Sequence, residues 1–233
     1  MHMTGEVRLL VATVAFVGFA AVLRAQAAPA PVPAATIVQR GNGRGAPACV
    51  SCHGARLQGL AAMLTPRIAG QRAPYLAAQL DAFANGTRRN ATMQPVAVAL
   101  SPAEREALGK YLAGLSPVAP VDSAAASASP AVLARGERLA VRGDWSVGLP
   151  SCDRCHGPRG VGVGDAFPPL LGQTPVYLAN QLDAWKQGTR PAGPLGLMGA
   201  IASRMTAGDV AAVSAYYGTL PLAAPPAVRG GTR

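Results

Sequence analysis

Apolar positions recur at helical spacing in two stretches of the chain that share one design. The first stretch starts from Pro74 and ends before Gly86, and the second runs from Pro175 to Gly188. A final helix is expected from the capping-box pattern at Ser101, and a second one from the similar pattern at Thr206. No segment alternates between apolar and polar residues for long enough to indicate a sheet. The pattern therefore predicts an all-α protein.

The two helical stretches belong to an internal repeat, since the second half of the chain matches the first when the two are aligned. The matching segments share their spacing and many of their residues: Pro66-Arg-Ile-Ala-Gly-Gln71 with Pro168-Pro-Leu-Leu-Gly-Gln173, Tyr75-Leu76 with Tyr177-Leu178, Gln79-Leu-Asp-Ala-Phe83 with Gln181-Leu-Asp-Ala-Trp185, and Gly86-Thr-Arg88 with Gly188-Thr-Arg190. The chain is therefore predicted to contain two copies of one domain.

The expected domains are residues 34–116 and 131–222. Between them, residues 117–130 are rich in Ala, Ser and Pro, which is typical of an extended linker, and residues 223–233 form a flexible tail. The second copy has an opening helix at residues 131–142, whereas the first offers only the shorter segment 34–40. The first domain is thus expected to begin with a shorter helical segment than the second.

Residues 1–28 have the pattern of a secretory signal peptide. Arg8 precedes an apolar run from Leu9 to Leu23, which is followed by Arg24 and Ala25-Gln-Ala27. The run is shorter than the roughly 18–20 residues of a spanning helix, although an uncleaved membrane anchor is the alternative. In either case we expect export to the periplasm.

The chain is basic, with 21 Lys and Arg against 11 Asp and Glu and a net charge of +10. Its densest basic run is only Arg88-Arg89, so the clustered charge and interleaved aromatic residues of a nucleic-acid interface are missing. The charge fits docking to an acidic redox partner or association with an anionic membrane surface. A generally solubilising arginine surface is an equally open interpretation.

The chemistry of the chain is concentrated in two copies of a C-x-x-C-H motif, Cys49-Val-Ser-Cys52-His53 and Cys152-Asp-Arg-Cys155-His156. This spacing is typical of c-type haem attachment, because two thiols one helical turn apart can bond to the two vinyl groups of a porphyrin while the histidine reaches the iron. A redox dithiol or a zinc site are the alternatives for paired cysteines, but neither needs a histidine directly after both pairs. The motifs predict two covalently bound haem c groups, with His53 and His156 as axial ligands.

The sixth ligand of each iron is expected to be a methionine. The sequence has three histidines, of which His2 lies in the signal segment, so none is left for the second axial position. Met93 and Met198 occupy matching places in the repeat, a few residues before the final helices, and we predict that they ligate the two irons. Met63 and Met205 have no such match and are expected to be ordinary packing residues.

Together these features resemble tandem class I cytochrome c domains, and in particular the dihaem cytochromes c of the c-four type. The resemblance covers residues 37–220 and rests on the paired C-x-x-C-H-G motifs, the P-x-[IL]-x-G-Q segments, the Y-L-x-x-Q-L-x-x-[FW] helices and the late methionines. The short first helix and Arg56-Leu-Gln58, in place of a Gly-rich stretch, depart from the family pattern and affect the expected exposure of the first haem.

The resemblance implies a periplasmic electron carrier, not an enzyme, that shuttles electrons between respiratory redox partners through two closed His/Met haems. Those partners would be a terminal oxidase, a bc-type complex or a periplasmic dehydrogenase. One alternative is the cytochrome subunit of a periplasmic dehydrogenase complex. A dihaem peroxidase is disfavoured, because it needs an open haem and each copy here has its methionine.

Overall fold

The computed structural model describes residues 30–120 and 128–222. Within these ranges the secondary structure is helical, with only isolated bridges between Asp144 and Leu149 and between Val163 and Phe167. The all-α prediction is therefore confirmed. The expected signal segment, the middle of the linker and the expected tail lie outside the described residues. No helix in the described ranges is both long enough and apolar enough to cross a membrane.

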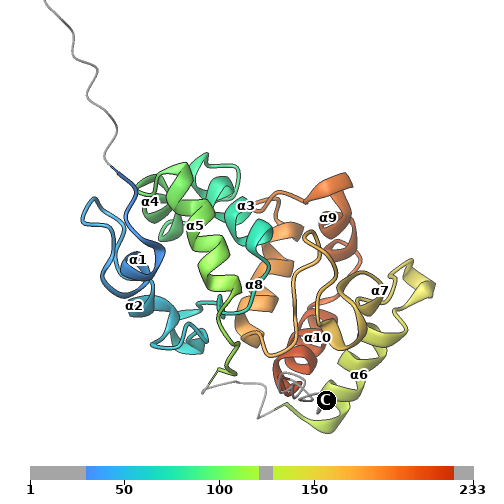
Figure 1. The fold of residues 1–233 in the computed structure, drawn as a ribbon. Coiled ribbons are helices and arrows are strands. Elements are labelled where there is room, and N and C mark those ends of the chain that lie inside the picture. The colour runs from blue at the N-terminus through green and yellow to red at the C-terminus, as the bar shows by residue number, and fades with distance from the viewer. Residues whose placement is uncertain (1–29, 121–127, 223–233) are drawn as a thin grey trace, which may run out of the picture. The chain divides into compact units, whose positions relative to one another are not determined.

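The N-terminal half is built on a pair of helices, α3 (Ala73–Ala84) and α5 (Pro102–Ala113), which pack against each other (Figure 1). The short helix α1 (Ala34–Arg40) packs on α5, and α4 (Met93–Val98) packs on α3. The remaining elements are α2 (Val50–His53) and the 3-10 turn η1 (Ala61–Met63). The core of this half gathers apolar residues from α1, α3 and α5, among them Ile37, Leu76, Leu108 and Leu112.

The C-terminal half repeats this plan with a longer first helix. Helix α6 (Pro130–Val141) packs on α10 (Ala207–Thr219), and α8 (Pro175–Lys186) packs on both α10 and α9 (Leu197–Ala202). Helix α7 (Asp153–His156) and the 3-10 turns η3 (Trp145–Val147), η4 (Pro158–Gly160) and η5 (Pro194–Gly196) complete the half. Its core includes Leu139, Leu149, Met205, Val213 and Tyr217. The two separate cores agree with the predicted pair of domains, whose boundaries stay a prediction.

Both final helices begin with the predicted capping boxes. Ser101 caps α5 with Glu104, and Thr206 caps α10 with Asp209. Glu104 is fully buried and also accepts hydrogen bonds from the Val32 N–H and from Arg44, so it fastens the N-terminal segment to α5. Burial alone would raise the pKa of Glu104, but the N–H groups of Val32 and Ser101 and the Arg44 guanidinium hold it at about 2.

Glycines let the final helix of each half, α5 or α10, pack closely against a neighbouring helix. A Cβ built on Gly109 of α5 would lie 2.6 Å from the Ala73 carbonyl oxygen of α3, and one on Gly136 of α6 would overlap the Ala212 carbonyl oxygen of α10. Neither position tolerates a side chain without separating the helices.

The two halves meet directly, and from Pro31 onward the described residues form one compact unit. Side chains from the ends of α3 and α8 meet across this contact: Arg88, which follows α3, donates to Gln181 of α8, and Arg190, which follows α8, donates to Gln79 of α3. At one end of this interface Arg67, which is 1% exposed, donates to the carbonyls of Leu171 (3.0 Å) and Gly172 (3.2 Å) in the other half and of Ala69 (2.6 Å) in its own.

Two matching glutamines extend this interface. Gln173 donates to the Arg67 carbonyl (2.9 Å) and accepts from the Arg67 N–H (2.7 Å). Its counterpart Gln71 donates to the Pro169 carbonyl (3.2 Å), but the Gln71 Oε1 is buried without a partner. The reason is chemical: Pro169 stands where the first copy has Arg67, and proline has no N–H to donate.

Candidate haem sites

The first C-x-x-C-H motif forms a single helical turn. Helix α2 follows Cys49, and the His53 N–H closes the turn by donating to the Cys49 carbonyl at 2.9 Å. His53 is 7% exposed, and its Nδ1 lies 2.9 Å from the Pro66 carbonyl oxygen. Because a carbonyl can only accept, Nδ1 carries the proton and Nε2 keeps its lone pair. The ring therefore presents the nitrogen that could bind a metal.

The second motif has the same geometry. The His156 N–H donates to the Cys152 carbonyl at 2.9 Å, and the His156 Nδ1 lies 2.9 Å from the Pro168 carbonyl oxygen. Burial lowers the pKa of both histidines, and the hydrogen bond to the proline carbonyl opposes that effect in each. Two neutral, oriented imidazoles result, each on the short helix directly after a pair of thiols.

None of the four cysteines forms a disulfide, so each sulfur is available for a covalent bond to a haem. Cys49 and Cys152 are the inner members of their pairs, and burial raises the pKa of each to about 11. Within residues 30–120 and 128–222 no three His, Cys, Asp or Glu side chains gather as a metal-holding group. The two pairs therefore remain separate sites in the structure.

The structure places Met93 and Met198 in matching short helices that the sequence pattern did not reveal. Met93 is the first residue of α4, which packs on α3, and Met198 lies in the first turn of α9, which packs on α8. Both are partly buried. Met205 is 5% exposed in the second core, as predicted for a packing residue. Met63 is 49% exposed, so the expectation that it fills a core is wrong.

The segment after each motif also follows one path despite its different residues. Gly160 adopts a φ of +67° after the second motif, and Leu57 takes the matching place in the first with a φ of +56°. The Leu57 side chain is 2% exposed in the first core, so its burial offsets the strain of the left-handed conformation. The departure at Arg56-Leu-Gln58 thus keeps the local fold.

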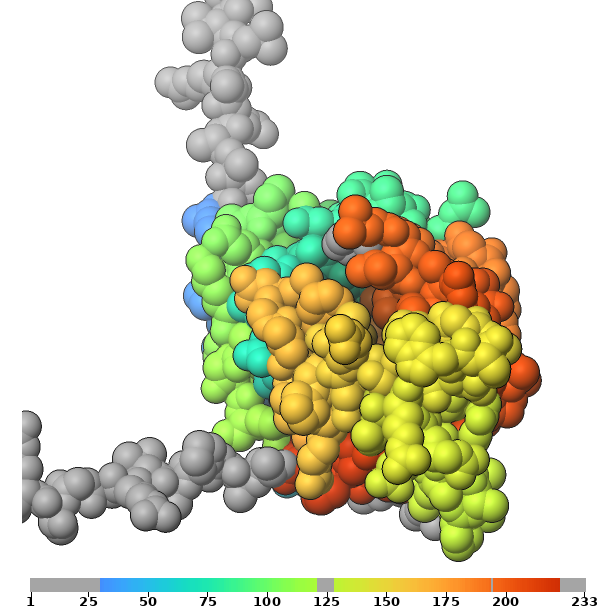
Figure 2. Space-filling view, turned by 90° about the vertical axis from the view of Figure 1, so that its right-hand side faces the viewer, coloured from blue at the N-terminus to red at the C-terminus, as the bar shows by residue number. Residues whose placement is uncertain are grey.

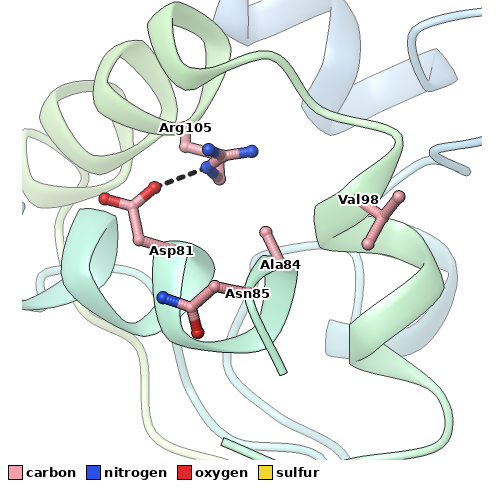
Figure 3. Close-up of a pocket in the computed structure, with 5 residues that line it drawn as sticks. All are labelled: Asp81, Ala84, Asn85, Val98 and Arg105. Atoms are coloured by element: carbon pink, nitrogen blue, oxygen red, sulfur yellow. Dashed lines mark hydrogen bonds and ion pairs between the residues drawn. The ribbon is translucent and has the colours of Figure 1, made fainter. Parts of the chain in front are cut away.

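The surface has one hollow beside the second C-x-x-C-H motif and another that contains none of the predicted haem residues. Figure 2 shows a hollow in the C-terminal half between the gold segment that contains the second motif and the orange-red segment of α9. Figure 3 shows a second hollow, of about 440 Å³, lined by Asp81, Ala84, Asn85, Val98 and Arg105. This second hollow carries the Asp81–Arg105 ion pair (2.6 Å) and none of the predicted haem residues. It is therefore not a candidate haem site.

The residues present fit haem c at both motifs. Each motif offers two free thiols one turn apart and a buried neutral imidazole whose Nδ1 is fixed by a carbonyl. This donor set is the one that covalent attachment and axial ligation of haem require. An all-α chain that carries it twice defines a dihaem c-type cytochrome.

Comparisons with known proteins support the assignment to the c-type cytochromes. The sequence profile of the cytochrome c family matches residues 38–116. A protein named thiosulfate dehydrogenase electron acceptor, from Stutzerimonas stutzeri (strain A1501), is 46% identical over 86% of this chain and 91% of its own length. The chain belongs to the cytochrome c family, among the dihaem cytochromes of the c4 type.

Solved structures show the same relationship. Reduced cytochrome c4 from Pseudomonas stutzeri aligns with a TM-score of 0.64 and 30% identity over 74% of this chain and 93% of that one. Thiosulfate dehydrogenase (TsdBA) from Marichromatium purpuratum aligns with a TM-score of 0.73 and 42% identity over 83% of this chain. The present chain spans only 41% of the length of that second structure.

The chain is accordingly a c-type cytochrome that carries two covalently bound haem c groups and transfers electrons. It is an electron carrier and does not itself catalyse a reaction on a substrate.

Proposed function

We propose that this chain accepts electrons from a thiosulfate dehydrogenase and stores them on two haems with His/Met ligation. Cys49 and Cys52 would attach the first haem, with His53 and Met93 as its axial ligands. Cys152, Cys155, His156 and Met198 would do the same for the second. The observation that carries this proposal is the 46% identity to a thiosulfate dehydrogenase electron acceptor along nearly the whole length of both chains.

The bound haem supplies one-electron chemistry, with the iron alternating between the ferric and ferrous states. The chain's own residues hold the ligands still. The Pro66 and Pro168 carbonyls orient the imidazoles, and helices α4 and α9 carry the methionines against α3 and α8. A closed pair of protein ligands leaves the iron little to rearrange and offers no open position to a substrate. This is what a carrier needs.

A spectrum of the ferric holoprotein, with its haem-to-chain ratio, tests the ligand assignment. We expect two haems per chain, both low-spin, with the near-infrared charge-transfer band of methionine-bound iron. Replacing Met93 or Met198 by Ala should remove about half of this band, since each haem contributes one such centre.

Met63→Leu and Met205→Leu are the matched controls, one at a half-exposed position and one in the core. Both variants should keep the full band. If Met198→Ala kept it and Met205→Leu lost part of it, the assignment of the second ligand would be wrong. A high-spin haem that binds cyanide in the unmodified protein would instead support a peroxidase.

A dehydrogenase partner is favoured over a terminal oxidase or a bc-type complex as the electron donor. The likeness to thiosulfate dehydrogenase (TsdBA) covers 83% of this chain but only 41% of that one, so in that protein a comparable cytochrome portion belongs to a larger chain. The net charge of +10 suits an acidic docking surface on a separate partner.

Stopped-flow mixing tests this partner. The ferric protein is mixed with thiosulfate in the presence and in the absence of a thiosulfate dehydrogenase, and haem reduction is followed by absorbance. We expect rapid reduction only with the enzyme, at a rate that falls as ionic strength rises. Equal rates with and without the enzyme would exclude this donor while leaving the haem assignment intact.

We further propose that the protein is exported to the periplasm, where residues 1–28 act as a signal peptide. The support is the basic and apolar pattern of that segment. Mass spectrometry of the holoprotein purified from the periplasmic fraction should give a chain that begins after Ala27 or Ala28. An intact N-terminus recovered only with membranes would indicate an anchor instead.

A further inference from the structure

The turn before the second C-x-x-C-H motif carries two large apolar side chains on the surface. Trp145 and Val147 belong to the 3-10 turn η3, and they are 71% and 51% exposed. The backbone on either side of them is held together, because Asp144 and Leu149 exchange two backbone hydrogen bonds (2.7 and 2.9 Å). A closed turn therefore presents the tryptophan to solvent.

A third exposed apolar side chain lies just before α9. Leu195 is 94% exposed and has a φ of +58°, a left-handed conformation that leucine rarely adopts. The other half has a similar backbone at Leu57, but there the side chain is buried in the core. Leu195 thus combines a strained backbone with an apolar side chain that the fold does not use.

These side chains come from two segments that flank one hollow. Figure 2 shows the yellow segment that contains η3, the gold segment that contains the second motif and the orange-red segment of α9 around the same hollow. A Cβ built on Gly148, directly after η3, would lie 3.5 Å from the Nε of Arg204, which follows α9 and donates to a carbonyl of that helix. We use the name apolar rim for Trp145, Val147 and Leu195.

The first copy of the repeat lacks the apolar rim. Where the second copy has Asp144-Trp-Ser-Val-Gly-Leu149 before its motif, the first has Asn42-Gly-Arg-Gly-Ala46. In the segments that lead to the methionines, Asn90 takes the place of Leu195. None of the three rim residues packs against the core of the second half. Since both copies fold without them, the exposed apolar residues serve a purpose other than folding.

Exposed arginines lie on the same segments. Arg142 precedes η3, Arg154 lies within the second motif, Arg159 follows that motif and Arg204 follows α9, and all four are exposed. None of the four makes an ion pair within residues 30–120 and 128–222. Their charges are therefore available to a partner molecule.

The carboxylates of these segments do not cancel that charge. Asp144 pairs with Arg135 (3.2 Å), and Asp153 accepts from the buried Tyr217 hydroxyl (2.7 Å). Asp165 is the one exposed carboxylate among residues 142–165 and 195–204, where the four exposed arginines lie. An apolar centre that contains a tryptophan, with arginines around it, has the composition of a protein interface, and its complement is an apolar surface surrounded by carboxylates.

A protein partner fits this face better than a second copy of the chain or a membrane. A symmetric dimer through the face would set the arginines of the two copies against one another. A membrane on the face would cover the hollow beside the second motif and keep other proteins away from it. Electron transfer between proteins slows steeply with distance, so a redox partner gains most by docking at this hollow.

We propose that the apolar rim is the docking site of the acidic redox protein that donates electrons to this chain, and that electrons enter at the second haem. The inference rests on the proposed function, in which that donor is a thiosulfate dehydrogenase, and adds the surface and the half at which it docks. The reduced donor loses one electron and the ferric iron of the second site gains it. The first haem then receives its electron from the second.

Stopped-flow reduction of the ferric holoprotein by thiosulfate and a thiosulfate dehydrogenase tests the docking site. Trp145→Ser and Leu195→Asn remove apolar surface, and asparagine suits the left-handed backbone at position 195. We expect the second-order rate constant to fall by about tenfold or more in each, as for a residue at the centre of an interface. Reduction by ascorbate should be unchanged in both, which shows that the haems are intact.

Two further variants sharpen the test. Arg204→Glu should slow the reduction at low ionic strength, and its difference from the parent should fade as salt is added. Met63→Ser is the matched control, because Met63 is 49% exposed, as Val147 is at 51%, and lies on the loop that contacts the first motif through Thr65. This control should keep the rate of the parent.

Parent rates in both Trp145→Ser and Leu195→Asn would overturn the inference and leave the proposed donor standing. A loss in Met63→Ser alone would overturn it too, since the donor would then dock on the first half. Two other results would assign the face to another occupant and contradict the inference. One is binding to anionic phospholipid vesicles that Trp145→Ser abolishes while the reduction rate stays unchanged, and the other is a dimer in sedimentation that the same variant dissociates.

If thiosulfate dehydrogenase fails to reduce even the parent, the proposed donor is wrong and an electrode tests the face by itself. A gold electrode coated with a mixed methyl- and carboxylate-terminated monolayer has the chemistry proposed for the partner surface. Slower interfacial electron transfer in Trp145→Ser and Arg204→Glu than in Met63→Ser would support the docking site. Equal transfer rates in all three variants would overturn it.

Discussion

Replacing Arg67 by Met should destabilise the holoprotein by about 3 kcal/mol and weaken the connection between its halves. The guanidinium donates to three carbonyls, those of Ala69, Leu171 and Gly172, and no other donor among the described residues reaches them. At about 2 kcal/mol for each buried acceptor left without a partner, the loss is about 6 kcal/mol.

The substitution also has a stabilising effect, because it removes the cost of burying the Arg67 charge. Burial lowers the pKa of Arg67 from 12.5 to about 10, which corresponds to about 3 kcal/mol at roughly 1.4 kcal/mol for each tenfold change in acidity. Because the side chain is only 1% exposed, solvent does little to reduce this figure. Lost hydrogen bonds therefore outweigh the relief of desolvation.

Guanidinium-induced unfolding, followed by far-ultraviolet circular dichroism, gives the free energy of unfolding. Calorimetry should also show the single transition of the parent splitting into two, because Arg67 joins the halves. Arg72→Met is the control: Arg72 is exposed and makes one long contact, 3.4 Å to the Gly162 carbonyl. A loss below about 1 kcal/mol in Arg67→Met, or a similar loss in both variants, would refute the reasoning.

Three further predictions concern a buried carboxylate, an unpaired buried oxygen and a close contact between two helices. Glu104→Gln should remove an acid-sensitive part of the stability. The folded pKa of Glu104 is about 2 against an ordinary 4.5, so the parent has this contribution, about 3 kcal/mol, above about pH 4.5 and loses it as the pH falls towards 2. The control Glu106→Gln, at the surface, should leave the acid unfolding curve unchanged. Pro169→Ala supplies the missing N–H for the Gln71 Oε1. In thermal unfolding this variant should be more stable than the control Pro168→Ala by about 1 kcal/mol, since both lose a proline but only the first gives the buried oxygen a donor. Equal stabilities of the two variants would contradict this account. Gly136→Ala should lower the free energy of unfolding by more than about 2 kcal/mol, because its Cβ would overlap the Ala212 carbonyl. The control Gly114→Ala should be neutral or stabilising, since its Cβ would meet nothing closer than 3.5 Å.

The sequence was sufficient for those parts of the fold that local chemistry decides. Prolines and capping boxes placed the starts of α3, α5, α8 and α10, and the structure confirms each of them. The short helices α4 and α9 were not predicted, because each has only six residues, too few to show a helical period. The exposure of Met63 was also missed, since an apolar residue outside a periodic segment carries no signal about which side it faces.

The contacts between the halves show why the rest could not be predicted. The repeat aligns Arg88 with Arg190 and Gln71 with Gln173, but alignment says only that the two positions are equivalent, not that they meet. A basic composition suggested surface arginines, whereas Arg67, Arg88 and Arg190 are among the most buried polar residues of the structure. Burial of a cation depends on acceptors that are distant in sequence, here carbonyls and glutamines of the other copy.

The same interface explains how a duplicated chain becomes two unequal sites. Gln71 and Gln173 make the same bond to the backbone of the opposite half, which preserves the symmetry of the repeat. One difference, Arg67 in the first copy against Pro169 in the second, breaks this symmetry. The Arg67 N–H donates to Gln173, so the Pro66–Arg67 peptide next to His53 is polarised. At the equivalent place Pro169 has no N–H, and the Gln71 Oε1 of the first half is left without a donor beside the Pro168–Pro169 segment that holds His156. Because the Pro66 carbonyl that holds His53 belongs to the peptide whose N–H donates to Gln173, the imidazole of the first site is linked to the second half by hydrogen bonds. The second site has no equivalent link, so a perturbation at the interface reaches the two histidines unequally.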